Sequence, residues 1–354
     1  MQREGYLRMT SAVKCAAYLI LVWLIGYLLV LGKSLLMPII IAVFIWNLLN
    51  TLNDLILKSP WVGGRLPYWF SMVLSLLIVV VLLSILINII TNNVSDVIGA
   101  SSRYQANLSH MFHAWDSQYA TRLLSSIDAF VKSLNVQSIL LNMYSVFSGL
   151  MGSAVLIALY VVFLFVEQHF FAAKILALFP QPSHRVMVDR IINKIAKDIQ
   201  TYLGLKTILG LITALSSWVL MRCVGLDFAE FWALLILCLS YIPNIGAIIA
   251  TAFPALLALI QFQSWGPFII ITSGIVTVQF IIGNLVEPRF LGKSLNLSPL
   301  IILFMLALWG SLWGILGMFL SVPITVMLMI VFAHFDATRP IAIILSQDGR
   351  IKKV

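Results

Sequence analysis

Residues Trp232–Ile260 read WALLILCLSYIPNIGAIIATAFPALLALI. The stretch is apolar almost throughout, yet Tyr-Ile-Pro-Asn-Ile-Gly interrupts it at Tyr241–Gly246. Proline removes a backbone donor and glycine loosens the chain, so a helix should break there. Hydrocarbon cannot hydrogen-bond the freed backbone groups. A break at membrane depth must therefore be buried in protein or line a watered cavity.

The composition is that of a polytopic membrane protein. Of the 354 residues, 61% are hydrophobic and 10% are charged, whereas soluble domains are about a quarter charged. The net charge is +9, and such an excess usually marks cytoplasmic loops. No basic patch with interleaved aromatics stands out, so we expect no nucleic-acid partner. Cys15, Cys223 and Cys238 lie in or beside apolar runs and are too few for a disulfide framework.

About six runs are long enough to cross a membrane, which takes roughly 20 apolar residues. The first is too long for a signal peptide and lacks a cleavage site, so we expect it to be a span. The runs are Val13–Gly32, Ser34–Leu49, Tyr68–Ile90, Phe147–Val166, Thr207–Cys223 and Phe268–Val286. Two longer blocks, Phe228–Gln261 and Pro299–Phe332, are each interrupted in the middle.

The interrupted blocks predict re-entrant hairpins. In the first block, the arm Trp232–Tyr241 has ten residues, and at 1.5 Å per residue it is roughly 15 Å long, half of the ~30 Å hydrocarbon core. This arm cannot cross alone, so two short helices and a turn would enter and leave by one face. A proline-kinked pair of spans with a tight loop is the alternative.

The second block repeats the first. Leu226 aligns with Leu295 and Pro254 with Pro323, 69 positions apart, without a gap. In this register the break Tyr241–Gly246 falls on Gly310–Ile315, and the turn-forming residues of the second block are Gly310, Gly314 and Gly317. One span separates the blocks, so they enter from opposite faces. Secondary transporters use such inverted repeats with broken helices to place a substrate site near the midplane.

The separating span carries a polar stripe. Ser273, Thr277, Asn284 and Glu287 share one helix face, with Gln279 off it. Polar side chains in a span face protein or water rather than lipid. These residues are therefore predicted either to line the path of a solute or to form hydrogen bonds between helices.

Two regions are less apolar. Residues 91–146 predict amphipathic helices outside the membrane; His110 and His113 share a face there, but no further ligands accompany them, so we expect no metal. Within the basic region Glu167–Lys206, apolar residues recur at helical spacing from Val188 to Tyr202. This helix would rest either on the inner leaflet or on the cytoplasmic side of the protein itself. The positive-inside rule then places both termini in the cytoplasm.

The motifs together resemble a known family. YIPNIG at Tyr241–Gly246, GNLVEPRFLGKSLNLSPL at Gly283–Leu300 and GMFLSVP at Gly317–Pro323 are similar to those of the autoinducer-2 exporter family of bacterial membrane proteins, in its quorum-signal exporter branch. The resemblance implies export or facilitated movement of small solutes, among them autoinducer-2, across the bacterial inner membrane. It also implies homo-oligomers, with the pentamer as the expected form, and sodium or lithium exchange for protons in some members.

Residue by residue, the resemblance covers Pro243, Asn244 and Gly246, then Glu287, Pro288, Arg289 and Gly292, and finally Pro323. Glu287 and Arg289 flank a proline at a helix end. They are interpreted either as a charge pair that closes a vestibule or as an interfacial cap and a snorkelling arginine.

We therefore predict a transporter of a small polar solute, with membrane lipid as its surroundings and no cofactor. A sodium/proton-type antiporter and a passive channel are the alternatives; an antiporter needs a titratable group at membrane depth, for which Glu287 is the nearest residue. No metalloprotease or phosphate-loop motif is present, so we expect no enzyme. The predicted units are 1–90 (scaffold spans), 91–146 (extracytoplasmic helices), 147–205 (a span and a basic linker), 206–332 (transport core with both hairpins) and 333–354 (cytoplasmic tail).

Overall fold

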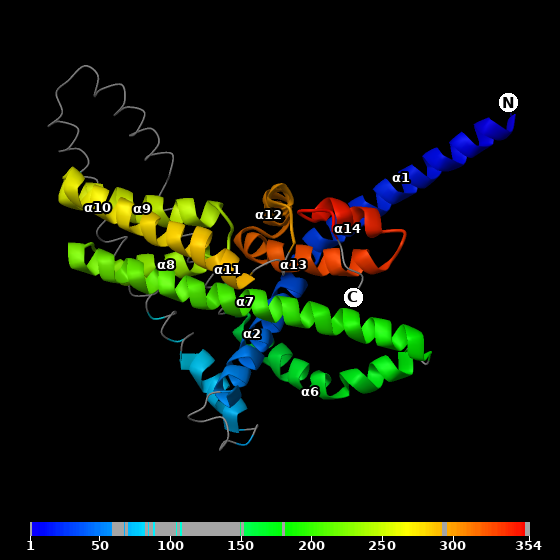
Figure 1. The fold of residues 1–354 in the computed structure, drawn as a ribbon, viewed down its shortest axis with the longest axis horizontal. Coiled ribbons are helices and arrows are strands. Elements are labelled where there is room, and N and C mark those ends of the chain that lie inside the picture. The colour runs from blue at the N-terminus through cyan, green and yellow to red at the C-terminus, as the bar shows by residue number, and fades with distance from the viewer. Residues whose placement is uncertain are drawn as a thin grey trace.

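The computed structural model describes residues 2–58, 67, 70–81, 84, 88, 104, 107, 149, 152–178, 181–291 and 296–350. These residues are almost entirely helical (Figure 1), which confirms the predicted all-α class. Residues 70–81 are helical. The other helices are α1 (Gln2–Leu31), α2 (Lys33–Lys58), α6 (Ala154–Leu178), α7 (Pro182–Val224), α8 (Ala229–Leu239), α9 (Ile245–Phe262), α10 (Trp265–Phe280), the π-helical η1 (Ile281–Val286), α11 (Glu287–Leu291), α12 (Pro299–Trp313), α13 (Ile315–His334) and α14 (Arg339–Leu345).

Six segments of the described part are long and apolar enough to cross a membrane. The number agrees with the prediction, but the set differs, because α9 and α13, the second arms of the interrupted blocks, are among them. The predicted span Tyr68–Ile90 lies partly outside the described residues. So does the region 91–146 with His110 and His113, except for Tyr104 and Asn107.

Helices α1 and α2 follow one another end to end rather than folding back (Figure 1). The N–H of Gly32 bonds the Leu28 carbonyl, and the N–H of Leu36 bonds the Gly32 carbonyl, so helical bonding runs almost unbroken through the joint. The indole N–H of Trp313 in α12 donates to the Leu29 carbonyl at 3.1 Å. The two predicted runs Val13–Gly32 and Ser34–Leu49 therefore form one nearly continuous helical segment, which contacts α12.

Helix α7 is the axis around which the other elements are arranged. It contains 43 residues and is roughly 65 Å long at 1.5 Å per residue. It ends at Gly225, which has φ 83° and donates its N–H to the carbonyls of Met221 and Arg222. The predicted boundary between residues 205 and 206 falls inside this helix, because no break separates its basic half from its apolar half.

The basic half of α7 packs on the protein itself. Ile191, Tyr202 and Leu203 are buried in one apolar cluster with side chains of α13 and α14, such as Met329 and Leu345. A helix that continues straight into a membrane-length segment cannot lie flat on the leaflet. Of the two interpretations, the structure supports packing on the protein over a helix resting on lipid.

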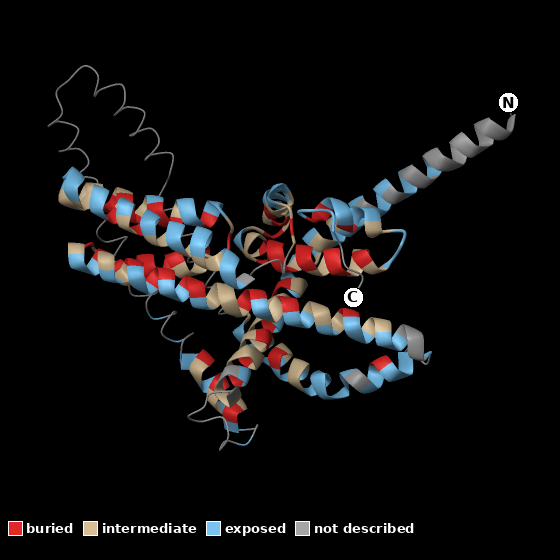
Figure 2. Ribbon diagram, viewed as in Figure 1, coloured by how far each residue is buried: buried red, intermediate tan, exposed pale blue. Residues whose placement is uncertain are grey.

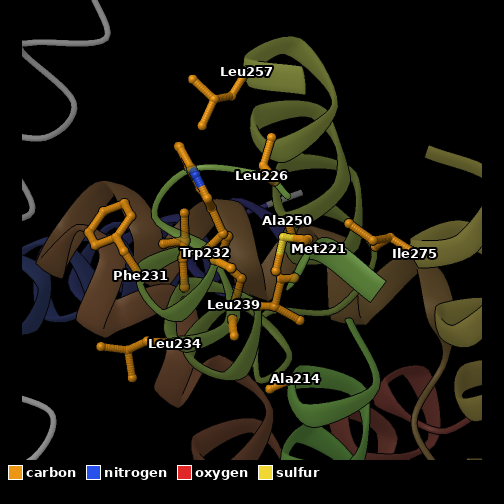
Figure 3. Close-up of a cluster of buried hydrophobic side chains, with 14 of the residues drawn as sticks. Ala214, Met221, Leu226, Phe231, Trp232, Leu234, Leu239, Ala250, Leu257 and Ile275 are labelled. Carbon is orange, nitrogen blue, oxygen red and sulfur yellow. The ribbon is translucent and has the colours of Figure 1, made fainter. Parts of the chain in front are cut away.

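Two helix pairs lie toward opposite ends of α7, the first pair being α8–α9 and the second pair α12–α13 (Figure 1). The first pair packs with α10 and the C-terminal half of α7 into a four-helix bundle. Its core contains Met221, Trp232, Leu239, Ala250 and Ile275 (Figure 3). The second pair packs against α7, α14 and α1. Figure 2 shows that buried residues concentrate on α8, α13 and the middle of α7.

In each pair, hydrogen bonds hold the helix ends that lie away from the connecting turn. These ends are called the base of the pair, and the turn is called its tip. In the first pair, the Gln261 side-chain amide donates to the Gly225 carbonyl at 2.9 Å and accepts the Asp227 N–H at 2.8 Å. Tyr104 donates its hydroxyl to Asp227 at 2.8 Å, and Asn107 bonds the Ile260 carbonyl at 3.2 Å. The base of the first pair and the described part of region 91–146 therefore lie together, at the end of α7 away from its basic half.

The C-terminal segment fastens the second pair. The N–H of Ser298, just before α12, donates to the Leu345 carbonyl at 3.0 Å, and the N–H of Gln347 donates to the Asn296 carbonyl at 3.0 Å. The pKa of Asp348 is lowered because its carboxylate accepts hydrogen bonds from the Arg350 N–H and the Asn296 side chain. Residues before α12 and after α13 are thus held together on the side of the basic half of α7.

Candidate functional site

The tips of the two helix pairs meet through aromatic side chains. Tyr241, in the turn of the first pair, lies against Phe319 in α13, with ring centroids 4.4 Å apart. Phe44 of α2 packs edge-on against both rings, with centroid distances of 6.1 Å to Tyr241 and 5.0 Å to Phe319. Three elements that are far apart in sequence therefore close on one another at this junction.

The junction lies beside the middle of α7. The hydroxyl oxygens of Thr207 and Tyr241 are 2.6 Å apart, a hydrogen bond in which either atom can donate. The same Thr207 hydroxyl donates to the Leu203 carbonyl of its own helix at 2.7 Å, so Tyr241 donates to Thr207. This bond ties the turn of the first pair to α7 at Thr207, 18 residues before Gly225. That separation is about 27 Å along α7 at 1.5 Å per residue.

An ion pair flanks the junction. The Lys206 ammonium in α7 and the Glu287 carboxylate in α11 are 2.6 Å apart, with side chains 11% and 23% exposed. Both charges are therefore largely withdrawn from water. Such a pair contributes less to stability than its Coulomb attraction suggests, but removing one partner leaves an uncompensated buried charge.

A π-helical turn places Glu287. The N–H of Glu287 bonds the Ile282 carbonyl, five residues back. Pro288 follows; it has no N–H, and its ring would strike the carbonyl four residues earlier in a regular helix. The wider π turn of η1 relieves this conflict just before the proline, and such turns are frequent at functional sites. Arg289 is exposed in α11. Pairing with Arg289 was one of two interpretations of Glu287, and the Glu287 carboxylate bonds Lys206.

Both tips depend on a glycine at close approach. A Cβ atom on Gly246 would lie 1.9 Å from the Leu239 carbonyl oxygen. A Cβ atom on Gly317 would lie 1.9 Å from the Trp309 carbonyl oxygen. In each pair, therefore, the first turn of the second arm touches the backbone at the end of the first arm. This equivalence joins residues 71 positions apart, two more than the register that aligns Pro254 with Pro323.

The remaining predicted turn residues occupy both sides of the tips. Asn244 is exposed with φ 59°, and Pro243 is half-buried beside it. In the second pair, α12 continues through Gly310 as far as Trp313, and the turn falls on Gly314, which has φ 69° and ψ −146°. Pro254 and Pro323 are buried inside α9 and α13.

The predicted polar stripe does not face the junction. Ser273 and Thr277 are exposed, and their hydroxyls donate to carbonyls four residues back in the same helix at 2.6 Å. Asn284 is exposed and bonds the Phe280 carbonyl at 3.3 Å. Gln279, off the stripe, accepts a hydrogen bond from Thr251 of α9 at 3.1 Å. Of the four stripe residues, the structure brings Glu287 alone to the junction.

Sequence reasoning missed Lys206, Thr207, Phe44 and Phe319. Lys206 carried a signal, because it is a basic residue directly before the apolar run Thr207–Cys223. The aromatic residues carried none, since a phenylalanine among apolar residues is ordinary in a membrane helix. Among the described residues, no group of three or more His, Cys, Asp or Glu side chains could hold a metal ion.

Comparison with known proteins connects this arrangement to a family. The model of the AI-2E family transporters matches residues 18–337, most of the chain. The chain belongs to the AI-2E transporter family. Membership in the AI-2E family makes it a multi-pass membrane transporter.

Two curated relatives cover nearly the whole chain, and a third covers half of it. The AI-2 transport protein TqsA of Escherichia coli (strain K12) is 26% identical over 319 residues, which are 89% of this chain and 90% of that protein. A putative transport protein of Haemophilus influenzae is 26% identical over 330 residues, 89% of this chain and 91% of its own. The putative transport protein YhhT of Escherichia coli (strain K12) is 34% identical over 178 residues, half of each chain.

Proposed function

We propose that this protein carries autoinducer-2 (AI-2), or a signal of similar size and polarity, across the bacterial inner membrane. The solute would pass between the tips of the two helix pairs, beside the Lys206–Glu287 ion pair. The contact of Tyr241 with Phe319, at 4.4 Å between ring centroids, carries the proposal, because it closes the space between the pairs next to buried charge. The AI-2 transport protein TqsA, similar over 89% of the chain, supports the choice of solute.

The pairs act in this proposal as re-entrant hairpins. Helix α8 has 11 residues and α12 has 15, which at 1.5 Å per residue gives about 17 and 23 Å, short of the ~30 Å core. Irregular backbone at that depth is tolerated where it lines a watered cavity. The exposed Asn244 at the first turn is consistent with such a cavity.

The hairpins would form an inverted repeat. The base of the first pair bonds Gly225 at the C-terminal end of α7, and the second pair packs with Ile191 near the N-terminal end. Their tips meet between these ends, beside Thr207. Two short helical pairs that approach a midplane from opposite faces are the arrangement that secondary transporters use for substrate sites.

Transport requires that the closed junction opens. Parting Tyr241 from Phe319 would break an aromatic contact, which is worth about 0.5–1.5 kcal/mol beyond its buried area. Separating Lys206 from Glu287 costs more unless solute or water replaces the lost partner. The ion pair would therefore hold the closed state, and a polar solute that bonds both groups would favour the open one.

We also propose an orientation in the membrane and an oligomeric state for the transporter. The basic half of α7 and the C-terminal segment would lie in the cytoplasm, and the base of the first pair would lie outside with region 91–146. The predicted cytoplasmic N-terminus would require the chain to reverse at Gly32, whereas helical bonding continues through that joint. A reporter fused after Val354 that is active only outside the cytoplasm should then stay silent. We further propose a homo-oligomer, with the pentamer as its expected form, whose protein mass in mild detergent should be a multiple of 39.5 kDa.

The test is transport by purified protein in liposomes. AI-2 loaded on one side should cross faster than in protein-free vesicles, with saturation at high concentration. A passive channel would show no saturation. A cation antiporter would instead acidify or alkalinise the lumen when a sodium or lithium gradient is imposed, without AI-2. If AI-2 does not move under any gradient, the proposed solute is wrong.

A further inference from the structure

Tyr202 lies in α7 one turn before Lys206, and its side chain is 3% exposed. Its ring belongs to the apolar cluster shared with α13 and α14. Its hydroxyl oxygen is buried and has no hydrogen-bond partner among the described residues. Leaving such a group unsatisfied costs free energy, and a phenylalanine would pack the same ring without that cost.

The unpartnered hydroxyl lies near the junction. Residues four apart share a helix face, so Tyr202 and Lys206 point the same way from α7. Phe44, which packs against Tyr241 and Phe319 at the junction, also packs against the apolar cluster that contains Tyr202. Other polar groups there already have partners, because Glu287 pairs with Lys206 and Tyr241 bonds Thr207. Of the polar groups described at this junction, the Tyr202 hydroxyl has its bonding capacity unused.

We propose that the Tyr202 hydroxyl is a hydrogen-bonding contact for the transported solute, made when the junction opens. This inference rests on the proposed function. The solute group that it meets is uncharged, because the Lys206–Glu287 pair already balances the buried charge beside it. A hydroxyl or carbonyl oxygen on a small solute fits both the burial and the electrostatics of this position.

The experiment compares Tyr202→Phe with wild type, using Tyr160→Phe as the matched control. Tyr160 is a half-buried residue of α6 that packs in a separate cluster with α2. AI-2 is the probe in proteoliposomes, and melting temperature in detergent is the second readout. We expect Tyr202→Phe to melt at or above the wild-type temperature and to raise the KM for AI-2 roughly five- to tenfold, the effect of one lost hydrogen bond. Tyr160→Phe should leave KM unchanged.

Two results would overturn the inference. An unchanged KM in Tyr202→Phe would show that the hydroxyl does not contact AI-2. A lower melting temperature would show that the hydroxyl has a structural partner. Failure of the proposed function looks different, because wild-type protein would then move no AI-2; the melting temperatures would still decide whether the hydroxyl is unpartnered in the resting protein.

Discussion

Tyr241 and Phe319 hold the tips of two helix pairs together, with their ring centroids 4.4 Å apart. Each belongs to a pair whose base is fastened elsewhere, the first by Gln261 and the second by the C-terminal segment. Each tip is also packed tightly by a glycine. Leu306 and Met318 of the second pair also pack against the core of the first. The tips are therefore where movement between the pairs would be controlled.

The tip glycines should not tolerate a methyl group. Gly246→Ala and Gly317→Ala would each force a Cβ atom to within 1.9 Å of a carbonyl oxygen, so the arms must separate. Overpacking of this kind costs about 1–3 kcal/mol. We expect lower melting temperatures in detergent and slower transport from both variants.

Gly26→Ala is the control for these substitutions, since a Cβ atom there meets nothing within 4 Å. This change should leave melting and transport close to wild type. Equal melting of Gly246→Ala, Gly317→Ala and Gly26→Ala would show that the tips are looser than the close approach requires.

The Lys206–Glu287 pair should show strong coupling. Lys206→Met leaves Glu287 without its cation, and Glu287→Gln leaves Lys206 without its anion. Because the side chains are 11% and 23% exposed, solvent screens part of the loss. We expect a coupling free energy of about 1–3 kcal/mol in a double-mutant cycle on thermal stability. Strictly additive losses would mean that the pair does not form.

The first turn should be open to water. Asn244→Cys, in a background without Cys15, Cys223 and Cys238, should react readily with a small water-soluble thiol reagent, because Asn244 is exposed. Leu235→Cys is the matched control in the first arm, where Leu235 is 6% exposed. AI-2 should slow the labelling of Asn244→Cys if the solute passes the turn. Equal labelling of the two positions would remove the hairpin interpretation.

The amino-acid pattern was sufficient for the helical class and the two interruptions. Proline and glycine act on the backbone locally, so the break after Leu239 could be read directly from the sequence. Glu287 could also be identified from the sequence, but for a different reason: a carboxylate is unusual at the end of an apolar run.

Partners across the fold could not be read in this way. Lys206 meets Glu287 because a π turn before Pro288 rotates the helix end, and such turns leave little trace in hydrophobic spacing. The gap-free register also placed Gly246 opposite Ile315, whereas its structural counterpart is Gly317. Helix α12 continues to Trp313 before the chain turns, so the first arm of the second pair is longer than that of the first. An alignment of apolar residues does not reveal this difference in helix length.

The polar stripe shows a further limit. Helical spacing placed Ser273 and Thr277 on one face correctly, but spacing alone does not say what that face meets. The hydroxyl of each residue donates to a backbone carbonyl of its own helix. Buried side chains on the other face of α10, Ile271 and Ile275, determine which way the helix packs.

Locking the tips together tests the central claim most directly. Cysteines at positions 241 and 319, introduced as Tyr241→Cys and Phe319→Cys in the background without native cysteines, can be joined by a short thiol cross-linker and released by a reductant or a cleavable link. We predict that AI-2 transport in proteoliposomes is lost on cross-linking and returns on release, while each single variant is unaffected by the reagent. Transport that continues unchanged with the tips joined would contradict a path between the two helix pairs.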